Sequence, residues 1–145
     1  MANAAARNGH EVVMWCRDAT QAEAITSTHR NPKYLSEFVL PLNVTATSDL
    51  AEAVKDTSLI LHALPCQLTP DWLRANRETL PANVVICSTA KGLYVPTKQL
   101  LGDAILSALG REQPLAFLSG PSFAKEIMKG DPTAVVVASK KLYHA

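Results

Sequence analysis

Hydrophobic and polar positions alternate along the chain in two rhythms. Short apolar runs bounded by turn residues predict strands, and segments with apolar residues every three or four positions predict helices. The predicted strands are Glu11 to Cys16, Val44 to Thr47, Ser58 to Leu64, Asn83 to Thr89, Leu115 to Leu118 and Ala134 to Ala138. The predicted helices are Met1 to Asn8, Ala19 to Thr28, a short helix capped by Ser48 or Asp49 and ending at Val54, Leu68 to Leu80, and Thr97 to Leu109. This alternation predicts an α/β fold with a doubly wound parallel sheet.

Local signals refine three of these segments. Asp18, followed three residues later by Gln21, predicts a capping box at the start of a helix. The stretch from His29 to Leu42 contains two prolines and is predicted to be an ordered loop. The last predicted helix is amphipathic, and the residues expected on its buried face are Leu101, Ile105, Ala108 and Leu109.

Composition narrows the class of protein. The chain has 145 residues, 48% of them hydrophobic, which is enough for one domain with a core. Its formal net charge is +1, so bulk electrostatics give no reason to expect a nucleic-acid partner. The apolar runs are too short for a membrane span. The cysteines Cys16, Cys66 and Cys87 have no metal-ligand spacing, and we expect reduced thiols in a cytoplasmic protein. An organellar transit peptide remains an alternative for the Ala- and Arg-containing start.

Candidate chemistry comes from the ends of the strands, since an open parallel sheet binds its ligand there. In a Rossmann-like unit, Arg17 follows the second strand, where it can face the 2′-phosphate of NADP or stack on adenine. A solvated surface arginine is the alternative for this residue. The other strand ends contribute Pro65-Cys66-Gln67, Lys91-Gly92 and Ser119-Gly120-Pro121-Ser122.

Two of these strand ends carry groups suited to phosphate or carbonyl oxygens. The ammonium of Lys91 can bind a phosphate or polarise a substrate oxygen, and its alternative is a solvated loop lysine. Gly120 permits close backbone approach, Pro121 is predicted in the first turn of a helix, and Ser122 is predicted to add a hydroxyl beside the free N–H groups there. An ordinary strand-to-helix turn is the alternative there. The histidines are scattered without metal-ligand spacing, so we expect no metal, and for His62 a packing role is favoured over catalysis.

With these residues in place, the sequence resembles the NAD(P)-dependent glycerol-3-phosphate dehydrogenases over nearly its whole length. Each matching piece is short, and the specificity lies in their order and spacing. The pieces are Asn8 to Val12, Trp15 to Asp18, Asn31 to Leu35, Leu40-Pro41, Thr47 to Leu50, Ala63 to Gln67, Ala90 to Gly92, Leu118 to Glu126 and Pro132 to Ala138. The pair formed by Lys91-Gly92 and the run Gly120 to Ala124 is the most specific.

The resemblance implies hydride transfer between NAD(P)H and dihydroxyacetone phosphate, giving glycerol 3-phosphate, and the reverse. It implies NAD or NADP as cofactor and a homodimer when full length. The substrate-binding residues that it implies are Lys91, Gly120 and Ser122. The cofactor-binding residues that it implies are Arg17, Tyr34, Pro65, Lys91 and Ala124.

Two features of the family are missing from this sequence. The family opens with a strand and a glycine-rich turn, and it continues into a helical substrate domain that carries the general-base lysine. Lys140 and Lys141 lie in the wrong place for that role, so we expect no catalytic residue here. Residues 1–145 are therefore interpreted as an incomplete dinucleotide-binding domain. Because its central strand would be missing between Glu11 to Cys16 and Ser58 to Leu64, we expect the isolated chain to be inactive and aggregated or partly folded.

Two other functions stay open at this point. The chain could be a short product without activity that binds a nucleotide or regulates a full-length enzyme. It could also belong to a related NAD(P)-dependent dehydrogenase with another substrate, although the Lys91-Gly92 and Gly120 to Ala124 pair favours glycerol phosphate.

Overall fold

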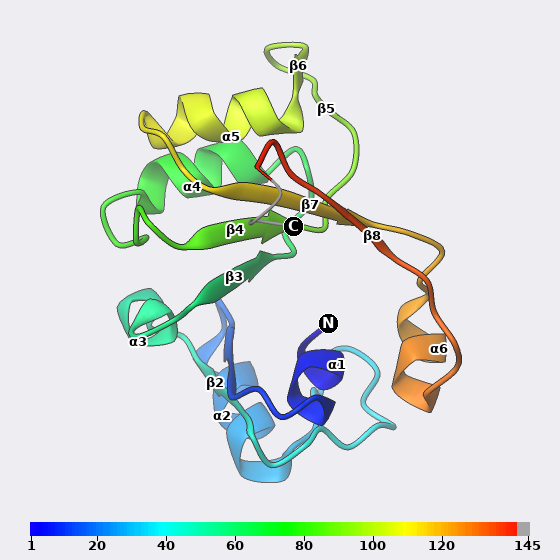
Figure 1. Cartoon of the computed structure of the whole chain (residues 1–145). Coiled ribbons are helices and arrows are strands. Elements are labelled where there is room, and N and C mark those ends of the chain that lie inside the picture. The colour runs from blue at the N-terminus through cyan, green and yellow to red at the C-terminus, as the bar shows by residue number, and fades with distance from the viewer. Residues whose placement is uncertain (142–145) are drawn as a thin grey trace. The chain divides into compact units, whose positions relative to one another are not determined.

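The computed structural model describes residues 1–141 as an α/β chain that forms two compact units (Figure 1). Unit 1 comprises Met1–Lys55 and Ser122–Thr133. Unit 2 comprises Asp56–Pro121 and the residues from Ala134 onward. None of the helices in residues 1–141 has the length and hydrophobicity needed to cross a lipid bilayer.

Unit 1 is built on two parallel strands with helices beside them. Its elements are α1 (Ala2–Arg7), β1 (Val12–Trp15), α2 (Ala19–Thr28), β2 (Val44–Thr47), α3 (Leu50–Val54) and α6 (Ala124–Lys129). Val12 pairs with Val44 at the start of the two strands. Helix α2 packs against β2, and Cys16, Ala22 and Ile25 form a small core between them. Burial of these apolar side chains stabilises the unit.

Aspartate caps fix the start of two helices in unit 1. The Asp18 carboxylate accepts hydrogen bonds from the backbone N–H groups of Thr20 and Gln21, and Asp49 caps α3 in the same way. The predicted boundaries of α2 and α3 are confirmed. The reciprocal half of the predicted capping box is not formed within residues 1–141, because the Gln21 side-chain oxygen accepts no hydrogen bond from the Asp18 N–H; Gln21 Nε2 instead donates to Asn31 Oδ1 at 3.0 Å.

Unit 2 contains a four-stranded sheet with two helices on one face. Its strands are β3 (Leu59–His62), β4 (Val85–Ser88), β7 (Leu115–Ser119) and β8 (Val136–Ala138), in that spatial order. The first three are parallel, and β8 pairs with β7 in the antiparallel sense. Helices α4 (Thr69–Asn76) and α5 (Leu101–Leu109) pack side by side against this sheet (Figure 1). The predicted buried face of α5 is confirmed, since all four of its residues are buried.

The main difference from the predicted elements is a small hairpin before α5. The segment Thr97 to Leu100 was expected to be helical, but β5 (Leu93–Tyr94) and β6 (Gln99–Leu100) pair there as antiparallel strands. Strand β3 ends at His62 and not at Leu64. Helix α4 likewise ends earlier than predicted, at Asn76.

Both β1 and β3 are edge strands in their own sheets. Within residues 1–141, β1 pairs with β2 alone and β3 pairs with β4 alone. Unit 1 also buries the side-chain amide of Asn3 without a hydrogen-bond partner among the described residues. Edge backbone groups and a buried unpaired amide each lower stability, by about 1–3 kcal/mol where no water reaches them.

Candidate functional site

Three of the predicted site residues, Pro65, Lys91 and Gly120, lie beyond the carboxyl ends of β3, β4 and β7 in unit 2. His62 of β3, Ser88 of β4 and Phe117 of β7 stand opposite one another in the strand register. Pro65, Lys91 and Gly120 each lie three positions beyond one of these residues. Because parallel strands deliver their carboxyl ends to the same edge, the register places all three candidates just beyond that edge.

Lys91 extends from a segment that is fixed on its N-terminal side. The N–H of Thr89 donates to His62 O at 3.0 Å, and the N–H of Ala90 donates to Ser88 Oγ at 3.2 Å. Lys91 itself is exposed, and its ammonium makes no ion pair or hydrogen bond with another residue of the described part of the chain. Gly92 follows with a φ of +113° and open space where a Cβ would stand. An ammonium that has no ion-pair partner among the described residues and lies next to an open position in the backbone is suited to an anionic ligand.

Gly120 is required by the fold of unit 2. Its φ is +157°, and a Cβ there would lie 2.4 Å from Ala134 O and 2.9 Å from Val135 Cα. The close approach predicted for this glycine is therefore made by the backbone that leads into β8. This contact does not test whether a substrate also touches Gly120, so its substrate-binding role stays a prediction.

The predicted helix start at Pro121 and Ser122 is wrong. Helix α6 begins at Ala124, and Phe123 is its N-cap residue. The extended backbone of Phe123 keeps both earlier residues out of the first turn. Ser122 and Ala124 belong to unit 1, whereas Gly120 belongs to unit 2. Their predicted contacts with substrate and cofactor are not tested by the structure.

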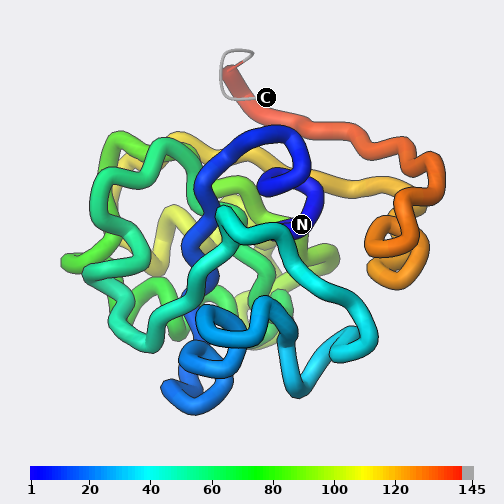
Figure 2. Tube along the Cα trace, turned by 90° about the horizontal axis from the view of Figure 1, so that it is seen from below, coloured from blue at the N-terminus to red at the C-terminus, as the bar shows by residue number. Residues whose placement is uncertain are grey.

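In unit 1, a charged pair joins the turn that carries Arg17 to the loop that carries Tyr34. Lys33 Nζ lies 2.6 Å from Asp18 Oδ2, and this hydrogen bond is the largest of the effects that lower the pKa of the Asp18 carboxyl. Asn31 Oδ1 accepts from the backbone N–H groups of Lys33 and Tyr34, which shapes the loop. The loop runs from α2 to β2 in Figure 2. Sequence reasoning identified Arg17 and Tyr34 but missed this pair.

Asp18 is consequently occupied on both oxygens. One oxygen caps α2, and the other binds Lys33. In NAD-binding Rossmann units an acidic side chain near this position accepts from the ribose hydroxyls. In this chain both oxygens of the Asp18 carboxylate instead accept hydrogen bonds from the protein itself. Arg17 and Tyr34 are both exposed, and the Arg17 guanidinium makes no ion pair within residues 1–141.

His62 closes the carboxyl end of β3 from inside the protein. Its Nε2 lies 3.1 Å from Thr69 Oγ1, and its ring stands 5.5 Å from the Trp72 ring. Only 5% of the residue is exposed, and burial lowers its pKa to about 4. The packing role favoured from the sequence agrees with this environment.

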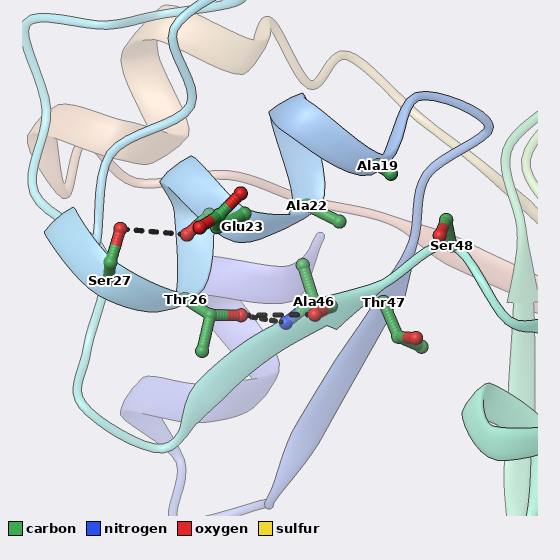
Figure 3. Close-up of a pocket in the computed structure, with 8 residues that line it drawn as sticks. All are labelled: Ala19, Ala22, Glu23, Thr26, Ser27, Ala46, Thr47 and Ser48. Carbon is green, nitrogen blue, oxygen red and sulfur yellow. Dashed lines mark hydrogen bonds between the residues drawn. The ribbon is translucent and has the colours of Figure 1, made fainter.

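A shallow hollow of about 350 Å³ lies elsewhere, between α2 and β2 (Figure 3). Three of its polar side chains already have partners. The Thr26 hydroxyl bonds the backbone of Ala46, the Ser27 hydroxyl donates to Glu23 O, and the Thr47 hydroxyl donates to Glu52. None of the candidate residues lines this hollow, so it gives no support for a ligand site. No cluster of three or more metal-binding side chains occurs within the described residues.

Comparisons with known proteins agree on one family. The profile described as "NAD-dependent glycerol-3-phosphate dehydrogenase N-terminus" matches residues 1–145. A glycerol-3-phosphate dehydrogenase (NAD(P)+) of Acinetobacter baumannii strain SDF is 43% identical over 139 residues, which cover 96% of this chain and 38% of that protein. A protein of the same name from Stenotrophomonas maltophilia strain R551-3 is 39% identical over 137 residues, covering 94% of this chain and 40% of that protein.

A solved structure gives the same result. The glycerol-3-phosphate dehydrogenase of Coxiella burnetii superposes with a TM-score of 0.86 at 28% identity, covering 97% of this chain and 42% of that one. The chain therefore spans about two fifths of the length of these relatives. A chimera in which the matched 139 residues replace their counterparts in the Acinetobacter protein would place this domain in a full-length setting.

Replacing Gly120 by alanine in that chimera should lower Tm by more than the change Gly92→Ala. Both changes force alanine into a φ that costs about 1–3 kcal/mol, but only the first adds a collision, with Ala134. The expected extra loss is about 5 °C or more, at roughly 2–4 °C per kcal/mol. Equal Tm values for the two variants, measured by calorimetry, would show that the close approach at Gly120 is not maintained.

His62 should make the domain sensitive to acid. Its pKa is about 4 when folded, against about 6.5 when unfolded, so the unfolded chain binds the extra proton between these values. The stabilisation is complete above about pH 6.5 and is lost as the pH falls toward 4, by about 3 kcal/mol in all. In the chimera, the Tm of His62→Gln should fall less steeply over this range than that of the unchanged protein. The exposed control His10→Gln should follow the unchanged protein, and parallel profiles for all three would contradict the assignment.

Proposed function

Because the chain belongs to the family of NAD-dependent glycerol-3-phosphate dehydrogenases, we propose that it supplies the part of such an enzyme that binds NAD(P) and one side of the substrate. The proposed reaction is hydride transfer between NAD(P)H and dihydroxyacetone phosphate, and its reverse. The observation that supports the proposal is that Lys91 follows the middle one of three parallel strands, with Pro65 and Gly120 following its two neighbours, and that its ammonium has no ion-pair partner within residues 1–141.

The residues present fit a dinucleotide, which would supply the hydride. A dinucleotide needs parallel strands whose carboxyl ends are accessible, and unit 2 offers them with open space at Gly92. In unit 1, the exposed Arg17 is the group proposed for the adenosine end, with Tyr34 on the loop beside its turn. Pro65 and Ala124 are proposed as further cofactor contacts.

Lys91 is proposed to bind the substrate and to stabilise negative charge on its oxygen. An ammonium placed where charge develops lowers the barrier most when no protein carboxylate competes for it. Lys91 meets this condition, since it has no ion-pair partner within residues 1–141. Gly120 and Ser122 are proposed to line the same substrate. The general base is expected outside this chain, so turnover requires more of the enzyme than residues 1–145.

The remaining proposals concern the whole protein. We propose a homodimer for the full-length protein, on the resemblance to the family alone. A cytoplasmic location and the lack of a nucleic-acid partner are proposed on the near-neutral charge and on the three cysteines, which form no disulfide. A short regulatory product without activity is the second candidate. The unpaired edges of β1 and β3 favour it only for the isolated chain, since such edges promote association.

Removal of the Lys91 ammonium tests the proposed function most directly. In the chimera, Lys91→Ala should lower kcat/KM for dihydroxyacetone phosphate by at least ~10²-fold, the usual scale for the loss of a charged donor near developing charge. Tm should hardly change, because the side chain is exposed and unpaired. Lys55→Ala, which removes another exposed lysine, is the control. A loss below about threefold would assign Lys91 to the solvated surface.

Arg17 should determine the choice between the two cofactors. In the chimera, Arg17→Asp should lower the ratio of kcat/KM for NADPH to that for NADH, because a carboxylate repels the 2′-phosphate and accepts from ribose hydroxyls. Arg17→Gln, which removes the charge without adding repulsion, should give an intermediate ratio. If both variants keep the original ratio in steady-state assays, Arg17 does not contact the cofactor.

A further inference from the structure

The segment that carries Lys91 is held on both sides, and the two holds are of different kinds. On the N-terminal side, the Thr89 N–H donates to His62 O of the neighbouring strand, and the Ala90 N–H donates to the Ser88 hydroxyl. On the C-terminal side, the Gln67 side chain makes one of the attachments. Gln67 Nε2 donates to Leu93 O at 2.7 Å, and Gln67 Oε1 accepts from the N–H of Val95 at 3.1 Å.

Gln67 is well placed to act as a fixed point. It lies in the turn between β3 and α4, where the N–H groups of Leu68 and Thr69 both donate to Pro65 O. Thr69 is fully buried and bonded to His62, so this turn is anchored to the inside of unit 2. A side chain that leaves such a turn transmits the position of β3 to the loop that follows β4.

A second anchor holds the hairpin itself. The Tyr94 side chain is buried, and its hydroxyl lies 3.4 Å from both carboxylate oxygens of Asp71 on α4. Tyr94 therefore fixes the hairpin to the helix, and Gln67 fixes the backbone on either side of Tyr94. Lys91 and Gly92 lie between the bonds at Thr89 and Ala90 and the attachments at Leu93 to Val95, and they make no backbone–backbone hydrogen bond within residues 1–141.

We propose that Gln67 is a positioning residue, which sets the place of the Lys91 ammonium by holding Leu93 and Val95. The inference rests on the proposed function of Lys91. Both polar atoms of the Gln67 amide bond the backbone of Leu93 and Val95, so the side chain acts on the reaction through the segment that carries the lysine. Without this hold, the loop after Ala90 gains freedom, and the ammonium is in the productive position for less of the time.

The first test is a double-mutant cycle in the Acinetobacter chimera, with dihydroxyacetone phosphate and NADPH as substrates. Gln67→Ala alone should lower kcat/KM by about tenfold, because both hydrogen bonds that hold Leu93 and Val95 are lost. In the Lys91→Ala background the same change should cost less than about twofold, because the group that Gln67 positions is gone. Tyr94→Phe, which removes the contact with Asp71, is the control for loosening of the hairpin in general.

The second test uses pH to restore the side-chain hydrogen bonds to Leu93 and Val95. In Gln67→Glu, the ionised side chain can accept from the Val95 N–H but repels Leu93 O, whereas the protonated carboxyl again offers one donor and one acceptor. Its kcat/KM, divided by that of the unchanged chimera at the same pH, should rise as the pH falls from about 6.5 toward about 4, because a glutamate carboxyl takes up its proton near a pKa of about 4.3. A loosened structure without a positioning role would give a flat ratio.

The outcomes separate this inference from the proposed function. A strong loss in Lys91→Ala together with an unchanged Gln67→Ala overturns the positioning role and leaves the function of Lys91 standing. Additive losses in the cycle also overturn it, since Gln67 then acts independently of the lysine. A Lys91→Ala variant with full activity overturns both.

Discussion

The parallel register of β3, β4 and β7 is the constraint on which the candidate site depends. Parallel strands end at a common edge, so residues far apart in the chain are delivered to one row without any contact between their side chains. The row His62, Ser88 and Phe117 is buried or half-buried, and the polar and flexible groups begin beyond it. A shift of one strand by one residue would move its candidate away from the row and reverse its buried face.

Much of this arrangement could be predicted from the sequence, because the deciding signals are local. An aspartate just before a helical pattern of apolar residues favours a helix start, and Asp18 and Asp49 cap helices at the predicted positions. The apolar strands and the buried face of α5 follow from burial, which the pattern records directly. The strand-end rule then located Lys91, Pro65 and Gly120 without knowledge of the contacts around them.

What the sequence could not give depends on partners distant in the chain. The hairpin of β5 and β6 replaces a helical turn because Gln67 bonds its backbone and Asp71 accepts from Tyr94. Likewise, nothing in the local pattern shows that Lys33 pairs with Asp18, or that Gly120 adjoins Ala134. Each is a tertiary contact that outweighs a weak local preference. The roles of Arg17, Tyr34, Ser122 and Ala124 stay predictions for the same reason.

The close approach at Gly120 also affects how the chain is assembled. The chain leaves unit 1 after Lys55, comes back at Ser122 and leaves again after Thr133, so neither unit is a continuous piece of sequence. The segment that contains α6 lies between β7 and β8 in the sequence, and these two strands pair with each other beside Gly120. During synthesis, unit 1 cannot be completed until Thr133 has left the ribosome, long after its two strands have emerged. A single cut after Lys55 would therefore leave Ser122–Thr133, which belong to unit 1, on the fragment that carries unit 2.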